Sequence, residues 1–209
     1  MPADFDQQTY WHQRFSAETS FEWLLSSTDF VAILKPLLSN LDRTSTRILN
    51  VGCGTSDLHN HFRRLGFLDV TNVDYEPLAI ERGQQLERQA FGDVKTKYAV
   101  ADATNPAIMN EKKKKKQKFN LVVDKSTVDA ISCGGEEQVR RMARCVRECL
   151  ADDDDDGGGA VWVSLSYSAA RFDLEGLPFA VEVLDKVLTA KKEVTDPDIY
   201  HWCYLLRPK

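Results

Sequence analysis

Short apolar runs alternate with helical patterns through the middle of the chain, and this alternation restricts the possible folds more than any other feature. The spacing predicts strands over residues 47–51, 69–74, 97–101, 119–124 and 160–166. It predicts helices over residues 58–66, 77–91 and 135–150. A strand followed by a helix and then by another strand needs a crossover connection, which makes the two strands parallel. The sequence therefore predicts an α/β fold with a doubly wound, mostly parallel sheet.

The two ends of the chain carry other patterns. Apolar and aromatic residues recur at intervals of three and four over residues 10–40, which predicts helical structure with a kink or restart at Pro36. Residues 179–189 fit a helix and a strand about equally well. Residues 199–206 favour a strand, because their aromatic side chains alternate.

Size and composition narrow the class of protein. A chain of 209 residues suits one domain, and we expect a helical cap at 1–45 and a Rossmann-like core at 46–209, present as a monomer. A net charge of −5 offers no general attraction to nucleic acid. The start of the chain is polar, and no apolar run approaches the roughly 20 residues that span a bilayer. A soluble, cytoplasmic protein without a membrane partner is expected.

The cysteines give no sign of a metal or redox site. The chain has five of them, an odd number, and no two are spaced as Cys-x-x-Cys. Cys145 and Cys149 stand four residues apart within a predicted helix, where packing is the simpler explanation. We therefore expect reduced thiols and no metal.

Two low-complexity runs precede the fourth and fifth predicted strands. They are Lys112–Lys116 and Asp152–Asp156, the second followed by three glycines. Like charges packed this densely repel one another, so both runs are predicted to be loops. In a sheet of this kind, ligands bind at the carboxyl ends of the strands. Both runs enter the sheet at the opposite edge. An attraction between them would be exposed and screened by salt, and would stabilise little.

The strongest local signal is the turn Gly52-Cys53-Gly54-Thr55-Ser56, between a predicted buried strand and a helix. Gly52 and Gly54 let the backbone approach a ligand without a side chain intervening, although such turns also occur for purely structural reasons. Asp74 ends the next predicted strand, twenty residues after Gly54. A carboxylate in that place accepts the hydroxyl hydrogens of a ribose in nucleotide-binding folds. The pair predicts a site for an adenosine-containing ligand.

Asp57 stands where the third glycine of a Gly-x-Gly-x-x-Gly motif would be. A dinucleotide places its pyrophosphate close to the start of the following helix, where a carboxylate repels it. S-adenosylmethionine has no phosphate and carries a sulfonium cation. The turn therefore favours adenosylmethionine over a dinucleotide.

Carboxylates also follow the third and fourth predicted strands. Asp102 is placed to accept a hydrogen bond from an adenine amino group, and Asp124 is placed where a methyl donor and its acceptor would meet. A single acid at a strand end is often a helix cap or a turn residue. Acids after three successive strands of an apolar sheet, however, predict an acidic rim around a ligand.

The pattern as a whole resembles class I S-adenosylmethionine-dependent methyltransferases, and more narrowly the elongation factor 1-alpha lysine methyltransferases, over nearly the full chain. The segment Tyr10-Trp11-His12-Gln13-Arg14-Phe15 resembles that family's Tyr-Trp-x-x-Arg-Tyr opening, and Phe21-Glu22-Trp23 resembles its aromatic-acid-Trp step. The most specific motif is Asp124-Lys125-Ser126-Thr127-Val128-Asp129-Ala130, which is similar to Glu/Asp-Lys-Gly-Thr-Leu-Asp-Ala. Two departures are Phe15, which lacks the tyrosine hydroxyl, and Ser126, which replaces glycine.

The resemblance implies a Rossmann-like sheet of seven strands, S-adenosylmethionine as cofactor, and a protein substrate, with elongation factor 1-alpha as the candidate. It also implies roles for particular residues. Trp11, Phe15 and Trp23 would close over the cofactor, the Gly52 and Gly54 turn would contact its amino-acid end, Asp74 and Tyr75 would hold ribose and adenine, Asp102 and Ala103 would flank the adenine, and Asp124 would lie near the methionine moiety. Without a cofactor, Trp11 and Trp23 would simply be the core of an amphipathic helix.

The expected chemistry is an in-line displacement at the sulfonium methyl by a neutral lysine amine, driven by alignment and desolvation. Asp124 and Lys125 are the candidate catalytic residues, the first to orient the amine and the second to fix the loop. An aromatic face formed by Tyr200, Trp202 and Tyr204 would suit either a lysine channel or the core. Two other functions fit the same pattern: methyl transfer to a small molecule, and a non-catalytic adenosylmethionine-binding scaffold.

Overall fold

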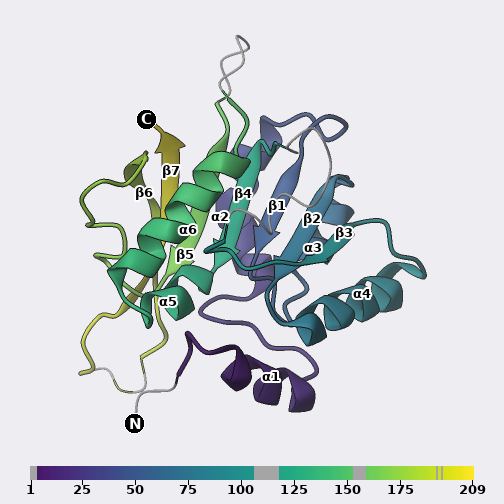
Figure 1. Cartoon of the computed structure of the whole chain (residues 1–209), viewed down its shortest axis with the longest axis horizontal. Coiled ribbons are helices and arrows are strands. Elements are labelled where there is room, and N and C mark those ends of the chain that lie inside the picture. Colours follow the sequence, from purple (N-terminus) through teal and green to yellow (C-terminus); the bar gives the residue numbers. More distant parts are fainter. Residues whose placement is uncertain (1–3, 106–117, 153–158, 192, 194) are drawn as a thin grey trace.

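Seven strands form one sheet in the order β3-β2-β1-β4-β5-β7-β6 (Figure 1). The computed structural model describes residues 4–105, 118–152, 159–191, 193 and 195–209. The strands are β1 (Ile48–Val51), β2 (Val70–Asp74), β3 (Lys97–Val100), β4 (Leu121–Lys125), β5 (Val161–Ser166), β6 (Phe179–Leu188) and β7 (Tyr200–Pro208). The helices are α1 (Gln8–Ala17), α2 (Ser27–Ser39), α3 (Leu58–Arg64), α4 (Pro77–Phe91), α5 (Thr127–Ser132) and α6 (Glu136–Cys149).

The parallel part of the sheet confirms the doubly wound fold predicted from the alternation. Strand β1 pairs in parallel with β2 on one side and with β4 on the other, while β3 extends the sheet beyond β2 and β5 extends it beyond β4. Strand β7 pairs antiparallel with both β5 and β6, so among the seven strands of this sheet it alone runs in the opposite direction. The register places Val51 beside both Val73 and Asp124. The carboxyl ends of these strands therefore meet at one edge, where the chain turns toward the following helices.

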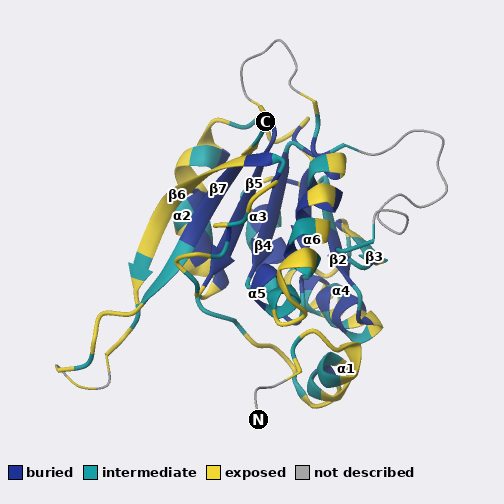
Figure 2. Ribbon diagram, turned by 60° about the vertical axis from the view of Figure 1, so that its left-hand side comes forward, coloured by how far each residue is buried: buried dark blue, intermediate teal, exposed yellow. Residues whose placement is uncertain are grey.

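Helices cover both faces of the sheet. In Figure 2 the central strands are coloured as buried and lie between these helices. Helices α5 and α6 pack on one face, where Met142, Val146 and Trp162 belong to one core cluster. Helices α2 and α3 pack on the other face, where Phe30, Leu34 and Phe62 are completely buried. The two apolar faces explain why β4 and β5 are apolar along most of their length rather than alternating.

Local signals account for several helix ends. Ser26 caps α2, because its hydroxyl accepts a hydrogen bond from the Asp29 N–H. Helix α4 begins at Pro77 and ends at Gly92, whose φ of +79° is the left-handed conformation that terminates helices. The predicted bounds of α4 are therefore confirmed.

The structure corrects the expected helical cap. The pattern over residues 10–40 forms two helices with a non-helical segment at 18–26 between them, and α2 runs through Pro36 without a break. Helix α2 also belongs to the layer that covers the sheet, since Phe30 and Leu34 are part of its core. Among the described residues of this region, those that lie at the strand ends come from the segment 5–24.

Other corrections concern the second half of the chain. The ambiguous 179–189 segment is a strand, β6, because it pairs along its whole length with β7. Helix α5 was not predicted, since six residues are too few to show a helical period. Lys112–Lys116 and residues 153–156 of the aspartate run lie outside the described residues; Asp152 forms ion pairs with Lys118 and Arg147. In the described part of the chain, no helix is long and apolar enough to span a membrane.

Glu87 on α4 fastens that helix to the start of β3. Its carboxylate is completely buried and accepts hydrogen bonds from Arg63, the Lys95 and Thr96 backbone, the Thr96 hydroxyl and the Tyr98 hydroxyl. Burial raises the pKa of this group, but the hydrogen bonds outweigh it and lower the pKa from 4.5 to about 2.

Because the folded-state pKa of Glu87 is depressed, its contribution to stability is present above pH 4.5 and is lost as the pH falls toward about 2. Glu87→Gln should lower the free energy of unfolding at pH 7 by about 3 kcal/mol, since the Arg63 charge loses its buried partner. Urea unfolding between pH 7 and 3 measures both effects. The exposed Glu81→Gln on the same helix is the control; an equal loss in both variants would contradict this role for Glu87.

Candidate functional site

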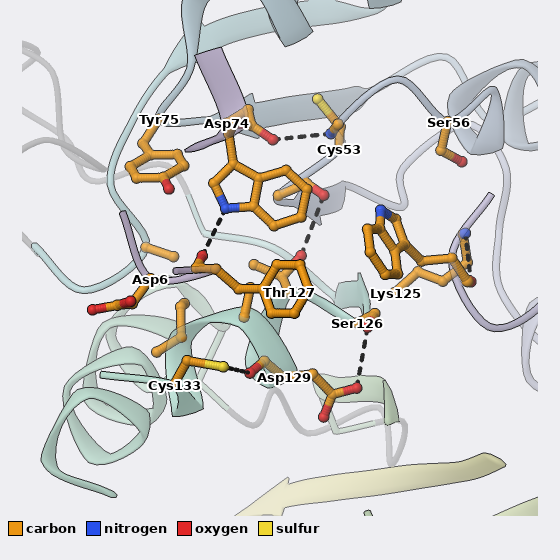
Figure 3. A pocket seen from close by; sticks show the side chains of 18 of the residues that line it. Asp6, Cys53, Ser56, Asp74, Tyr75, Lys125, Ser126, Thr127, Asp129 and Cys133 are labelled. Atoms are coloured by element: carbon orange, nitrogen blue, oxygen red, sulfur yellow. Dashed lines mark hydrogen bonds between the residues drawn. The ribbon is translucent and has the colours of Figure 1, made fainter. Parts of the chain in front are cut away.

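A cavity of about 730 Å³ lies where the carboxyl ends of the parallel strands meet the N-terminal segment. It is lined by the turn after β1, by Asp74 and Tyr75 at the end of β2, by residues 101–104 after β3 and by residues 125–127 at the end of β4. Trp11, Phe15 and Trp23 line it from the N-terminal side. The structure therefore brings most of the sequence-predicted site residues together in one place. Figure 3 shows Asp74 and Tyr75 on one side of this space and Lys125, Ser126 and Asp129 on another.

The glycine-rich turn is built on a close approach between two loops. Gly52 has a φ of +61° and Gly54 a φ of +51°. A Cβ atom on Gly52 would stand 2.1 Å from Oγ1 of Thr127, which itself donates hydrogen bonds to the Val51 and Gly52 carbonyls. The turn after β1 is thus bonded to the turn after β4, and only glycine leaves room for the threonine at this point.

Asp74 anchors the other side of the same turn. One of its carboxylate oxygens accepts from the Gly54 N–H at 2.9 Å and the other accepts from the Glu76 N–H at 3.0 Å. Burial raises the pKa of Asp74 to about 6, while these two backbone hydrogen bonds act in the opposite direction. Each carboxylate oxygen has a second lone pair, so Asp74 can still accept from a ligand hydroxyl. Tyr75 lies next to it, and burial followed by the Asp74 charge raises its pKa.

Asp102 and Ala103 line the cavity beyond Asp74. Asp102 accepts from the backbone N–H and the hydroxyl of Thr104 through the same oxygen, Oδ1, which shapes the turn after β3. Ala103 is buried and belongs to the core beneath the cavity. The edge therefore carries Asp74 and Asp102 side by side at its β2–β3 end.

An aromatic cluster closes the N-terminal side of the cavity. The rings of Trp11 and Phe15 lie 5.4 Å apart, and those of Trp11 and Trp23 lie 5.9 Å apart. The Trp11 indole N–H donates to the Phe5 carbonyl at 2.7 Å. Phe15 is buried, and its ring lies 3.7 Å from the position that a Cβ on Gly54 would take. The Phe15 ring thus stands over the glycine turn, and Trp11 and Trp23 extend the cluster from it.

Two acidic residues that periodicity could not reveal tie this aromatic segment to the turn. Glu18 accepts from the Thr55 hydroxyl at 2.5 Å, and Thr55 in turn accepts from the Phe21 N–H. Glu22 accepts from the Ser27 and Ser56 hydroxyls and from the Asp57 N–H. Only the family-like Phe21-Glu22-Trp23 motif marked Glu22 in the sequence. Hydrogen bonds between segments more than 30 residues apart leave no periodic pattern.

The structure gives Lys125 a different role from a catalytic one. Its ammonium donates to the carbonyls of Trp23 and Leu25 at 3.0 and 3.2 Å and forms an ion pair with Glu22 at 2.6 Å. Burial lowers the pKa of Lys125, and the Glu22 charge acts in the opposite direction. An ammonium has three N–H donors, and all three are engaged here. Lys125 therefore fixes the 22–25 segment and has no free donor for a substrate.

Asp124 does not line the cavity, contrary to the expectation that it orients an acceptor amine. Its side chain is completely buried below the strand end, where it accepts from the Trp162 indole N–H at 2.8 Å and from the Val128 N–H at 3.1 Å. Burial raises its pKa to about 7. The sequence placed Asp124 at the correct strand end, but alternation along the strand turns its side chain into the core.

Asp129, in the first turn of α5, is the acid of the Asp124–Ala130 motif that lines the cavity (Figure 3). It accepts from the Ser126 and Ser166 hydroxyls and the Tyr167 N–H, and forms an ion pair with Arg171 at 2.8 Å. The guanidinium of Arg171 lies 5.2 Å from the centre of the Tyr167 ring, and Tyr167 also lines the cavity. Tyr167 and Arg171 were not predicted, because they lie in an irregular segment after β5.

The aromatic face of β7 does not reach the cavity. Tyr204 is buried in the core and donates to the Ser168 carbonyl, while Trp202 packs against the same core. The Lys186 ammonium lies 4.9 Å from the centre of the Tyr200 ring. The structure supports the core-strand alternative rather than a lysine channel.

Comparison with known proteins identifies the family. Residues 42–153, more than half of the chain, match the family model of the methyltransferase domain. The protein is 56% identical over 206 residues to the methyltransferase srdJ of Neurospora crassa, covering 99% of this chain and 85% of the relative. The chain belongs to the class I S-adenosylmethionine-dependent methyltransferases.

More distant relatives are named as lysine methyltransferases. The eEF1A lysine and N-terminal methyltransferase homolog of Drosophila melanogaster is 30% identical over 139 residues, or 66% of this chain. The aligned part is only 19% of that relative, so the methyltransferase here spans a fraction of its length. The mitochondrial citrate synthase-lysine N-methyltransferase of Homo sapiens is 28% identical over 66% of this chain and 59% of its own.

Solved structures show the same fold at low sequence identity. The N-methyltransferase NodS of Bradyrhizobium japonicum, in complex with S-adenosyl-l-homocysteine, superposes with a TM-score of 0.62 over 95% of this chain and 99% of its own, at 15% identity. Magnesium protoporphyrin IX methyltransferase of Synechocystis, with its bound cofactor, superposes with a TM-score of 0.63 over 99% and 98%, at 9% identity.

S-adenosylmethionine is the cofactor of this family, and the cavity fits it. The buried Asp74 carboxylate suits a ribose, and the backbone of the glycine turn is exposed to the cavity next to it. The volume of about 730 Å³ lies in the range of small-molecule sites and leaves space for an acceptor. In the described part of the chain, no three His, Cys, Asp or Glu side chains gather in a group that could hold a metal ion.

Two glycines with positive φ provide a matched test of the turn. Gly52→Ala should abolish binding of S-adenosylhomocysteine, because the new Cβ displaces Thr127, whereas Gly92→Ala has a free surrounding and should cost only about 1 kcal/mol of stability. Calorimetric titration together with thermal unfolding separates the two effects. Unchanged binding in a folded Gly52→Ala variant would contradict the role of this turn.

Proposed function

We propose that this enzyme transfers the methyl group of S-adenosylmethionine to the side-chain amine of a lysine in a protein, with elongation factor 1-alpha as the candidate substrate. The observation that carries the proposal is the division of the cavity into two chemically different ends. At the β2–β3 end, the carboxylate oxygens of Asp74 and Asp102 still have lone pairs that can accept hydrogen bonds from a ligand. At the β4–β5 end, the charged groups Lys125 and Asp129 are neutralised by Glu22 and Arg171.

The β2–β3 end is the proposed adenosine side. Asp74 would accept from the ribose hydroxyls, Asp102 and Ala103 would flank the adenine, and Tyr75 would pack beside both. The turn at Gly52 and Gly54 would take the amino-acid end, and Trp11, Phe15 and Trp23 would cover the bound molecule. The cofactor supplies an electrophilic methyl group on a sulfonium centre. The protein's part is to hold that centre toward the β4–β5 end and exclude water from it.

The β4–β5 end is the proposed acceptor side, and its charge balance suits an uncharged amine. A protonated amine has no lone pair and would also lose its hydration there without a free carboxylate to compensate. The acceptor would therefore lose its proton to solvent before the transfer. Alignment and desolvation then carry the reaction, and Asp124 contributes by holding the start of α5 through Val128. Two relatives named as lysine methyltransferases support an amine on a protein as the acceptor.

The direct test incubates the purified enzyme with tritiated S-adenosylmethionine and three acceptors: elongation factor 1-alpha, the protein fraction of a cell lysate, and a metabolite extract. The proposal expects label on a lysine of a protein, identified by mass spectrometry. Asp74→Asn is the matched negative control, because one amide oxygen cannot replace both carboxylate oxygens. Label confined to the metabolite extract would replace the proposal with small-molecule methylation.

The pH dependence follows from the paired charges. A lysine amine ordinarily has a pKa of about 10.4, so the fraction of neutral acceptor rises about tenfold for each pH unit below that value. We expect kcat/KM for the acceptor to rise with nearly that slope between pH 7 and 9. A plateau beginning near pH 7 would instead indicate a base within the site. Initial rates at saturating cofactor measure the profile.

The remaining parts of the proposal concern the state of the protein in the cell. A monomer is expected, because the substrate end must stay open to a large acceptor. A cytoplasmic location is expected from the candidate substrate.

A further inference from the structure

The cavity wall contains a strained three-residue turn centred on Leu24. Its φ is +63°, and Leu24 is one of two non-glycine residues with positive φ in the described part of the chain. The Leu25 N–H donates to the Trp23 carbonyl at 2.7 Å, two residues back, which defines a γ-turn. A γ-turn with positive φ is rare and strained, and a bulky leucine has no local reason to adopt it. Leu24 lines the cavity and also packs, partly buried, against the core cluster on the α2 and α3 face of the sheet.

The surrounding structure holds this turn from two sides. The Lys125 ammonium donates to the carbonyls on either side of Leu24, those of Trp23 and Leu25. Its third donor goes to Glu22, and the side chain of Lys125 is only 5% exposed. His201 of β7 lies close to the Leu24 backbone. The buried ammonium of Lys125 thus holds the backbone on both sides of Leu24, although residues 24 and 125 lie far apart in the chain.

The position of the turn identifies the end of the cavity that it shapes. Lys125 ends β4, and His201 lies on β7, which pairs with β5. In the sheet order, these strands lie on the side of β1 opposite to β2 and β3, where Asp74 and Asp102 stand. Tyr167, which follows β5, lines the same cavity. Leu24 therefore lies at the proposed acceptor side and away from the proposed adenosine side.

We propose that Leu24 is a specificity-determining residue for the methyl acceptor, and that Lys125 is the positioning residue that keeps it in the cavity wall. This inference rests on the proposed function. Strain maintained at a site commonly serves that site, because an unstrained turn would place the side chain elsewhere. The apolar Leu24 and the aromatic Tyr167 then form a surface for the alkyl stem of an amine, and acceptors are selected by how their stem fits against Leu24.

The experiment compares Leu24→Ala, Lys125→Met and the double variant with the unaltered enzyme. Lys118→Met is the control, since Lys118 also binds a backbone carbonyl but precedes β4 and does not line the cavity. The first readout needs no acceptor: backbone amide exchange of residues 22–25, with calorimetric binding of S-adenosylhomocysteine. We expect exchange at least tenfold faster in Lys125→Met and unchanged in Lys118→Met, with affinity within threefold in Leu24→Ala and Lys118→Met. Unchanged exchange in Lys125→Met would overturn the role of Lys125 as the positioning residue of Leu24.

The second readout is transfer of tritiated methyl groups to the acceptor fraction that the unaltered enzyme labels, whether protein or metabolite. Leu24→Ala and Lys125→Met should each raise KM for that acceptor about tenfold, change kcat less than threefold, and label acceptors that the unaltered enzyme rejects. The double variant should be no worse than Lys125→Met alone, because both act through one side chain. Unchanged selectivity in Leu24→Ala, or additive losses, would overturn the inference. Label on metabolites alone would refute lysine methylation of a protein. The selectivity of Leu24→Ala and Lys125→Met for the labelled metabolite would still decide whether Leu24 selects the acceptor.

Discussion

The contact between Gly52 and Thr127 is the constraint on which the site depends. Parallel strands β1 and β4 deliver their turns to the same edge, and the missing side chain at Gly52 lets Thr127 bond to both carbonyls at the end of β1. Asp74 completes the arrangement from β2 through the Gly54 N–H. Three neighbouring strand ends are therefore held in one rigid unit before any ligand enters. A site that must align two reactants benefits from this rigidity, because the alignment is supplied by folding rather than by binding.

Much of this arrangement could be predicted from local sequence. Strand and helix alternation gave the parallel sheet, and the turn at Gly52 and Gly54 with Asp74 after the next strand gave the cofactor end, since both signals lie within about 25 residues. The acceptor end could not be predicted in the same way. Lys125 and the segment that it holds are separated by 100 residues or more, and their contact depends on the path of residues 18–26 over the sheet. Asp124 shows the same limit: its position along the strand was correct, but whether the side chain faces the core or the cavity is a tertiary property.

The paired charges of the proposed acceptor end explain how polar groups can line a cavity without destabilising the protein. Lys125 and Asp129 would each be costly to bury alone, but Glu22 and Arg171 neutralise them, and hydroxyl and backbone groups satisfy the remaining valences. Each pair also joins segments that are distant in sequence, so the electrostatic requirement and the structural one are met by the same contacts. The residues that hold the walls in place are consequently already engaged, in keeping with the proposal that the protein contributes orientation and the exclusion of water.

Glu22 also shows why this Rossmann-like fold suits an adenosyl sulfonium better than a dinucleotide. In dinucleotide-binding relatives of the fold, the first N–H groups of the helix after the glycine turn face a pyrophosphate. Here the Asp57 N–H at the start of α3 donates to Glu22, and Ser56 donates to the same carboxylate. The protein's own anion thus occupies the place that a phosphate would need, beside the further negative charge of Asp57. A ligand phosphate would have to displace a carboxylate that is also bound to Lys125, whereas a sulfonium cation meets no such obstacle.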